Sequence, residues 1–302
     1  MPPRLRVLRE FDPWRSRLCT CPPKYSLHPY TGCSHLCLYC YATSYLGRKS
    51  STPKRDFLRR LALDLKRANK NLPVAMSTSS DPYPPEEAEL RLARKTLELL
   101  LRGGYRVLIV TKSDLVTRDV DLIRGRPVSV SITITTLDRK LAKLLEPHAP
   151  PPSARLSALR ELARAGIPVS ARVDPVIPLL NDDPEELREL VAKIAEAGAS
   201  HVVTSAYKAK PDNLARLCLA FPDCAAKLRE LYYTRGERVG RYRYLRRDLR
   251  ITLLRPVVEE ARRLGLTYAT CREGLLSREF FSAPTCDGTH LLYREAGSAI
   301  GL

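Results

Sequence analysis

The sequence predicts an α/β fold built around a parallel β-sheet. Short apolar runs alternate with helical stretches from about residue 25 onward, and successive runs begin roughly 30 residues apart, the length of a β-α-β unit. Strands repeated in this way are parallel and are joined by right-handed crossovers. The spacing fits a barrel or partial barrel, and a doubly wound open sheet is the alternative.

Six segments have the composition of strands. They are short and rich in Val, Ile and Tyr, which favour extended backbone. In chain order they are Tyr25–Leu27, Val74–Ser77, Arg106–Thr111, Val128–Thr133, Val169–Val173 and His201–Thr204. Barrels of this kind carry their chemistry at the carboxyl ends of the strands, so the loops after these segments are where a site is expected.

Helices are expected in the intervals between the strands. Their positions are Lys54–Ala68, Glu86–Leu101, Leu115–Ile123, Ser153–Ala165 and Asp183–Ala197. Asp183 before Pro184 is typical of a helix start, because the Asp side chain caps the helix and Pro suits its first position.

The two ends of the chain depart from this rhythm. We assign residues 1–24 to an N-terminal extension, residues 25–205 to the barrel and residues 206–302 to a basic C-terminal extension packed on the barrel. Helices near Leu214–Tyr232 and Thr252–Leu264 are expected in that last part.

The composition is that of a globular protein with a large core. The chain has 302 residues, of which 44% are hydrophobic and 28% charged. No apolar run reaches the roughly 18 residues of a membrane span, and the first residues lack the apolar core of a secretory signal. We therefore expect a soluble, cytoplasmic protein without a membrane partner.

The formal net charge of +18 favours a polyanionic partner, nucleic acid above all. The alternative is a charged surface that serves solubility in a thermophile. Gln is absent and Asn occurs at only four positions, which fits a thermophile because these amides are thermolabile.

Nine cysteines in a long chain without a signal favour metal or redox chemistry over a disulfide framework. Cys33, Cys37 and Cys40 fall together in TGCSHLCLYCYATSY, just after the first predicted strand. Thiolates are soft ligands that suit iron–sulfur clusters and zinc. A 4Fe-4S cluster on three cysteines leaves one iron without a protein ligand, and S-adenosylmethionine can occupy that position through its amino and carboxylate groups.

The alternative for this loop is a zinc site whose fourth ligand is His35 or Cys21. Structural zinc sites usually combine two pairs of cysteines or histidines, which the triplet does not provide. The spacing therefore favours the 4Fe-4S cluster.

At these residues the chain resembles the radical S-adenosylmethionine superfamily, and within it the spore photoproduct lyase-like branch, over roughly residues 20–290. The matching stretches are YSLHPYTGCSHLCLYCYA, STSSDPYPPEE, TKS, EPHAPPPSARL and GIPVSARVDPVIPLLND. The resemblance implies a partial (β/α)6 barrel and a cluster fed by an external one-electron donor. It also implies reductive cleavage of S-adenosylmethionine to a 5′-deoxyadenosyl radical.

The resemblance also implies roles for individual residues. Tyr39 matches the aromatic residue beside adenine, and Tyr41 matches a tyrosine that relays a radical in the lyase. Lys112, after the third strand, matches a lyase position near S-adenosylmethionine, and Ser80, after the second strand, is a further candidate for binding the cofactor.

Ser131 on the fourth strand matches a further position near S-adenosylmethionine. Arg172 and Asp174, on the fifth strand, match residues that bind its ribose or carboxylate. The alternatives are a strand-end cap or solvated side chain for Lys112 and Ser131, and a structural ion pair for Arg172 and Asp174.

One departure from the lyase concerns its hydrogen-donating cysteine at the end of the second strand. The stretch AMSTSSDPY has hydroxyls there, from Ser77, Thr78, Ser79 and Ser80, and no thiol. Hydroxyls are poor hydrogen-atom donors, so the resemblance implies the branch and not the lyase reaction.

Two further pairs of cysteines lie at opposite ends of the sequence. Cys19 and Cys21 precede the first strand, whereas Cys271 and Cys286 follow the predicted barrel. If the four cysteines lie together, they would form a zinc or auxiliary iron–sulfur site that attaches the C-terminal extension to the barrel. Unligated buried thiols are the alternative.

The C-terminal extension contains an arginine- and tyrosine-rich stretch. Arginine guanidinium groups bind phosphates, and aromatic rings stack on unpaired bases, so the stretch is a candidate nucleic-acid interface. The alternative is an amphipathic helix, which fits the same spacing. The residues are Arg235, Arg238, Arg241, Arg243, Arg246, Arg247 and Arg250 with Tyr232, Tyr233, Tyr242 and Tyr244.

Three functions are consistent with these patterns. The first is a radical enzyme that repairs or modifies nucleic acid. The second is a radical enzyme acting on a peptide or small molecule. The third is a non-catalytic metal-binding protein of nucleic acid, against which Lys112, Ser131 and Arg172 count.

Overall fold

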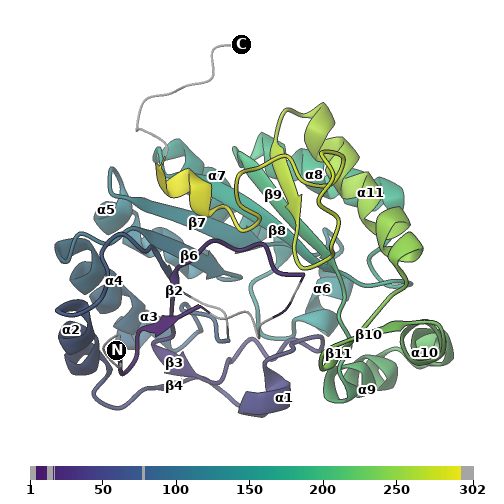
Figure 1. The fold of residues 1–302 in the computed structure, drawn as a ribbon, viewed down its shortest axis with the longest axis horizontal. Helices are drawn as coiled ribbons and strands as arrows, with labels where there is room; N and C mark the ends of the chain where they lie inside the picture. The colour runs from purple at the N-terminus through teal and green to yellow at the C-terminus, as the bar shows by residue number, and fades with distance from the viewer. Residues whose placement is uncertain (1–4, 12–15, 17, 77–78, 294–302) are drawn as a thin grey trace.

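The computed structural model describes residues 5–11, 16, 18–76 and 79–293. Its main sheet has eight strands in the order β1-β2-β5-β6-β7-β8-β9-β12 (Figure 1). Their bounds are β1 Arg9–Glu10, β2 Tyr25–Leu27, β5 Val74–Met76, β6 Val107–Thr111, β7 Val128–Thr133, β8 Val169–Val176, β9 His201–Ala206 and β12 Thr267–Thr270. All neighbours from β2 to β12 are parallel, and β1 is antiparallel to β2.

The sheet is an open partial barrel, as the sequence predicts, because the strand pairings leave β1 and β12 as its two edges. Helices connect the strands. Their bounds are α2 Phe57–Leu65, α3 Glu87–Leu90, α4 Leu92–Arg102, α5 Val120–Ile123, α6 Arg139–Leu145, α7 Pro152–Arg164, α8 Pro184–Glu196 and α11 Arg247–Arg263. Asp183 caps α8 by accepting from the backbone N–H groups of Glu185 and Glu186, as expected.

The sheet has an apolar outer face and a polar inner face. Side chains alternate along a strand, and Val128, Val130 and Ile132 of β7 join the main core with residues of the helices. Ser129 and Ser131 therefore point the other way. We call this second face the inner face; it also carries Arg172 and Asp174 of β8, whose neighbours in sequence belong to the main core.

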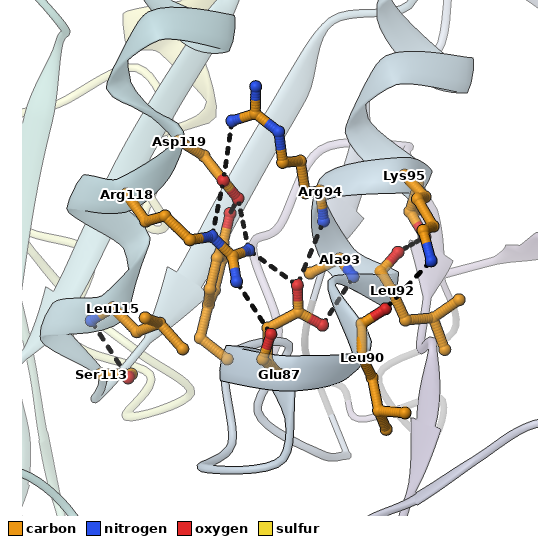
Figure 2. A network of polar contacts seen from close by, with 12 residues as sticks. Glu87, Leu90, Leu92, Ala93, Arg94, Lys95, Ser113, Leu115, Arg118 and Asp119 are labelled. Carbon is orange, nitrogen blue, oxygen red and sulfur yellow. Dashed lines mark hydrogen bonds and ion pairs between the residues drawn. The ribbon is translucent and has the colours of Figure 1, made fainter.

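The Glu87 side chain connects several elements at the edge of the barrel through its hydrogen bonds (Figure 2). Its buried carboxylate accepts from the backbone N–H of Ala93 at 2.8 Å and from Arg118 at 2.8 Å. The hydroxyl of Tyr30 also donates to it. These contacts join α3, α4, the 3-10 helix η1 (Asp114–Asp119) and β3 (Tyr30–Thr31), which leads into the cysteine loop.

Two predicted helices are broken in the structure. The expected Glu86–Leu101 helix divides into α3 and α4 at Arg91, whose φ is 48°. The expected Leu214–Tyr232 helix is three segments, α9 (Pro211–Ala220), α10 (Pro222–Arg229) and the π-helix η2 (Glu230–Thr234). Pro222 starts a new helix because it has no N–H for the preceding turn.

The rest of the C-terminal part also differs from the expectation. The helix α11 begins at Arg247, earlier than Thr252, and Tyr242–Tyr244 forms the strand β11, paired with β10 (Glu237–Val239). The strand β12 extends the main sheet beyond β9. Among the described helices, none is long and apolar enough to cross a membrane.

Candidate active site

The cysteine loop lies between β3 and the short helix α1 (Thr43–Leu46). Gly32 enters it with φ at 80°, and a Cβ there would lie 2.3 Å from the carbonyl oxygen of Ser50. Glycine is therefore required where the loop passes residues 49–50. Cys33, Cys37 and Cys40 line one cavity and form no disulfide.

Asp81 supports this loop from the carboxyl end of β5. Its carboxylate accepts from the Thr111 hydroxyl at 2.6 Å and from the backbone N–H of Lys112 at 2.8 Å. His35 Nε2 lies 3.3 Å from the same carboxylate. Burial alone would raise the pKa of Asp81, but His35 and these hydrogen bonds lower it to about 2.

These contacts argue against the zinc alternative for the loop. His35 faces Asp81 through Nε2 and the carbonyl of His148 through Nδ1, at 3.3 Å in each case. Cys21 lies beside Cys286, with 3.5 Å between their sulfurs. Neither residue is placed as a fourth ligand for the triplet.

Tyr39 is buried against a charged pair. Its hydroxyl donates to Glu146, whose other oxygen lies 2.5 Å from Arg155. Burial alone would raise the pKa of Glu146, but Arg155 and Lys112 lower it. Lys112 Nζ lies 5.4 Å from the centroid of the Tyr39 ring, a cation–π distance. The loop tyrosine and Lys112 therefore meet at the carboxyl end of β6.

Lys112 is a half-buried cation that interacts with Cys37 and Glu146. Burial alone would lower its pKa, but Cys37 and Glu146 raise it, so the ammonium form persists. The amino group points toward the cysteine loop and is placed to bind an anionic group there.

The inner face of the sheet carries hydroxyls that have no hydrogen-bond partner among the described residues. These are the buried side chains of Ser129, Ser131 and Ser170. Ser131 on β7 is the register partner of Ser170 on β8. Buried hydroxyls without partners are costly, so this face fits a polar ligand.

Arg172 and Asp174 form an ion pair at 2.5 Å, and the Ser205 hydroxyl donates to Asp174. This is the contact expected of a structural pair, and both side chains face the barrel interior. Ser80 differs from the other candidates, because its hydroxyl donates to the backbone carbonyl of Tyr30 at 3.1 Å. Ser77 and Thr78 lie outside the described residues.

The C-terminal extension contacts the cysteine loop directly. Arg216 of α9 donates to the carbonyls of Leu38 at 3.1 Å and Cys40 at 3.3 Å. Asn213 donates to the carbonyl of Tyr39 at 3.1 Å. Helix α9 therefore holds the loop backbone through its carbonyl groups.

Tyr41 lies where the loop meets the extension. Burial raises its pKa well above the usual value, with further contributions from Tyr45, Cys40 and Tyr242. A neutral, half-buried phenol beside other aromatic groups suits a redox-active tyrosine as well as a packing one.

Sequence reasoning did not single out several of these residues. Asp81 and Glu146 lie inside the matching stretches STSSDPYPPEE and EPHAPPPSARL, so the stretches held the signal although no role was assigned. The residues Asn213 and Arg216 of α9 had no local motif, because their role depends on the packing of distant segments.

A family model described as the radical SAM superfamily matches residues 27–194, more than half of the chain. The chain belongs to the radical SAM superfamily, where SAM is S-adenosylmethionine. It is therefore a radical SAM enzyme, and the non-catalytic alternative is wrong. The family implies SAM and an iron–sulfur cluster.

Curated relatives include an uncharacterised protein of Mycobacterium tuberculosis, 30% identical over 230 residues, which are 70% of this chain and 68% of that protein. A radical SAM Nalpha-GlyT isomerase of Pseudomonas phage M6 is 25% identical over 258 residues, 81% of this chain and 53% of the isomerase.

Among solved structures, a spore photoproduct lyase variant with dinucleoside spore photoproduct matches with a TM-score of 0.65. Identity is 19%, and the match covers 82% of this chain and 75% of the lyase. The likeness confirms the partial-barrel fold.

The residues present fit the cofactors of the family. Three free thiols of one loop line a common cavity, and the Lys112 cation interacts with Cys37. Thiolate ligands for iron and polar groups for a zwitterion are therefore within one site.

Proposed function

We propose that Cys33, Cys37 and Cys40 hold a 4Fe-4S cluster and that the enzyme cleaves SAM reductively to act on nucleic acid. The observation that carries the first part is that three free thiols line one cavity beside Lys112 and Asp81, at the carboxyl ends of β5 and β6. When bound, the cluster supplies one electron, drawn from an external donor, to the sulfonium C–S bond.

The side chains around the loop would position SAM. The Lys112 ammonium suits its carboxylate, and the Ser131 hydroxyl would gain the hydrogen bond that it otherwise lacks. The Arg172–Asp174 pair would provide a positive and a negative group for the remaining polar groups of SAM. Tyr39 would stack beside the adenine, held in place by its bond to Glu146.

We assign Tyr41 a relay role, because it connects the cysteine loop with the extension that would bind substrate. Ser80 would act indirectly, since its bond to the Tyr30 carbonyl fixes the start of the loop. The lyase reaction itself is not proposed, because no thiol stands at the end of the second strand.

Nucleic acid is supported as the substrate class by charge and position. The net charge is +18, and Arg241, Arg246 and Arg247 are exposed on and beside the β10–β11 hairpin. This hairpin lies near the cysteine loop, since the Lys210 amino group contacts Ser44 of α1 and lies 4.5 Å from the ring centroid of Tyr242. The dinucleoside bound by the structurally similar lyase is consistent with this class.

The tyrosines of the extension need a different role from the one expected. Tyr232, Tyr242 and Tyr244 are buried, and at β11 the two buried tyrosines alternate with the more exposed Arg241 and Arg243. Stacking on bases is therefore left to the exposed Tyr233 and to Tyr45 of α1. Arg250 is also buried, bound to Glu273, and serves the fold.

The central test is anaerobic reconstitution with iron and sulfide, followed by dithionite reduction in the presence of SAM. We expect about four irons per chain and formation of 5′-deoxyadenosine. Cys37→Ala should abolish the product, because the loop loses one of its three ligands. Cys224→Ala is the matched control, since Cys224 lies outside both cysteine groups, and it should retain full activity.

If Cys37→Ala still forms 5′-deoxyadenosine, the assignment of the cluster is wrong. Substrate is identified by adding DNA, tRNA and peptide pools and following consumption of SAM. Stimulation by peptide and not by nucleic acid would replace the proposed substrate class with the second alternative.

A further inference from the structure

Four cysteines from opposite ends of the chain lie together on the inner face of the sheet. Cys19 and Cys21 precede β2, Cys271 follows β12 directly, and Cys286 precedes the 3-10 helix η3 (Thr289–Tyr293). The Sγ atoms of Cys21 and Cys286 are 3.5 Å apart. Thiol–thiol contacts also join Cys19 to Cys21 and Cys271 to Cys286.

This cluster is separate from the cysteine loop. The carbonyl of Cys286 lies 3.2 Å from His201 Nε2 at the start of β9, and the backbone N–H of Cys271 donates to Thr204. In Figure 1 the purple N-terminal segment and the yellow C-terminal segment run close together beside β9 and β12. The proposed SAM-cleaving chemistry uses none of the four thiols.

The position of the cluster relates to the open shape of the sheet. Cys19 and Cys21 belong to the segment between β1 and β2, which form one edge. Cys271 continues β12, the opposite edge. A group bound by all four thiols would connect the two edges of the sheet that main-chain pairing leaves apart.

We propose that Cys19, Cys21, Cys271 and Cys286 bind one Zn²⁺ ion that links the two edges of the open barrel. The sulfurs of a tetrahedral four-thiolate zinc site are about 3.8 Å apart, because each Zn–S bond is about 2.3 Å. The 3.5 Å between Cys21 and Cys286 is close to that separation. The cysteine sulfurs of a 4Fe-4S cluster bind different irons and lie further apart, which argues against that cluster at this pair.

The thiols are arranged as an unbranched chain, Cys19 to Cys21 to Cys286 to Cys271, and no group of three metal-binding side chains in the described ranges encloses a single point. Closing the chain around an ion requires movement of the two outer side chains. The inner pair already has the separation of two ligands.

Two cations, each also paired with a carboxylate, lie beside the thiols. Four thiolates and Zn²⁺ carry a net charge of −2, which burial would penalise unless cations lie nearby. Lys24, paired with Asp287, interacts with Cys21 and Cys286. Arg172 interacts with Cys271 and Cys286. The same arginine belongs to the ion pair that we assign to SAM binding.

The test measures zinc and iron separately in the purified full-length chain by mass spectrometry. We expect about one zinc per chain. Cys21→Ser and Cys271→Ser should each lose most of the zinc while keeping the iron of the reconstituted loop. Cys218→Ser, which removes a buried thiol outside both groups, should keep both metals.

Two further measurements distinguish this zinc site from the cysteine loop and from an effect of the substitutions on folding. A chain with Cys33, Cys37 and Cys40 all replaced by Ala should still bind zinc, which separates this site from the proposed cluster. Cobalt added to the zinc-depleted parent should give the intense thiolate-to-metal absorption of a tetrahedral site with four cysteine ligands.

Three results would overturn the proposal. One is an equal zinc content in the parent, Cys21→Ser and Cys271→Ser. Another is a Cys21–Cys286 disulfide in the native chain, found by peptide mapping, with no zinc bound. The third is additional iron and sulfide in place of zinc, which would make the site an auxiliary cluster.

Discussion

Glu146 is a buried carboxylate whose direct ion-pair partner is Arg155, with Lys112 as a second nearby cation. Arg155 lies 2.5 Å away and is itself buried, whereas Tyr39 and Thr135 contribute hydroxyl donors. Two charges buried together depend on each other, because removing one leaves the other without compensation. The Glu146–Arg155 pair therefore positions the ring of Tyr39 and stabilises the packing around it.

We predict that Arg155→Met destabilises the protein by about 3–5 kcal/mol, because the ionised Glu146 is left buried without its ion-pair partner. The free energy of unfolding is measured by urea titration. Arg164→Met, at an exposed position of the same helix α7, is the matched control and should change it by less than about 0.5 kcal/mol. Equal effects of the two variants would contradict the prediction.

At the residue scale, the sequence indicated the functional side chains whose signal is local. Cys33, Cys37 and Cys40 are recognised from spacing alone. Asp81 gained no role from the sequence, because its partners His35 and Lys112 come from other segments and meet it only in the folded barrel. Ser80 shows the opposite case, a residue in a matching stretch whose hydroxyl is used by the backbone.

The cysteine loop depends on a close approach between backbones at Gly32. A Cβ at this position would lie 2.3 Å from the Ser50 carbonyl and 2.8 Å from the Lys49 carbonyl. Neither neighbour is a flexible side chain, so the loop itself would have to move.

We predict that Gly32→Ala lowers the iron content after reconstitution severalfold, because the displaced loop no longer brings its thiols together. Gly166→Ala is the control, since Gly166, just after α7, has a φ of 77° but no atom lies within 4 Å of the position that its Cβ would take. It carries only the backbone strain of a left-handed residue, about 1–2 kcal/mol. An iron content equal in both variants would show that the close approach is unimportant.

The β10–β11 hairpin is the element that would contact nucleic acid. Replacing Arg241, Arg246 and Arg247 with Ser should flatten the slope of log affinity against log salt by about 2 to 2.7, if each contacts one phosphate. Binding is measured by fluorescence anisotropy at several salt concentrations.

The matched control for the hairpin removes the same charge from a distant helix. Arg59 and Arg60 of α2 and the nearby Arg67 are exposed, and α2 lies far from the hairpin in Figure 1. Their replacement with Ser should leave the slope almost unchanged. If the hairpin variant also keeps the parent slope, the extension is structural and the second substrate class is favoured.

At the element scale, strands were predicted more accurately than helices. The six expected strands match β2, β5, β6, β7, β8 and β9 within a few residues, because their Val- and Ile-rich runs are buried on the outer face. The break at Arg91 depends on a left-handed residue that no glycine announces. The alternation of Arg and Tyr at 241–244 has the period of a strand and not of a helix.

The whole molecule is held together by segments that are distant in sequence. Residues 206–302 supply β12 to the main sheet, and α11 contributes Leu254, Val257 and Val258 to the main core. The N-terminal segment supplies β1 at the opposite edge. The sequence could not reveal β12, since the four residues TYAT carry little apolar signal and take their place only by pairing with β9.

We predict that residues 1–205 do not fold cooperatively without residues 206–302. Burying each of the three apolar side chains of α11 contributes about 1.5–3 kcal/mol. Their sum is comparable to the whole stability of a typical protein, about 5–15 kcal/mol. The shorter chain would also expose the edge of β9, which invites aggregation. Urea titration followed by circular dichroism should show a gradual loss of signal.

Co-expression distinguishes missing contacts from a damaged chain. Residues 206–302 supplied as a separate polypeptide should bind residues 1–205 and restore a sigmoidal urea transition, because the lost surface is covered again. The same polypeptide with Val257→Asp and Val258→Asp should fail, since two buried carboxylates would meet the apolar side of the sheet. A sigmoidal transition for residues 1–205 alone would instead show that the barrel is an independent domain and that β12 and α11 are accessories.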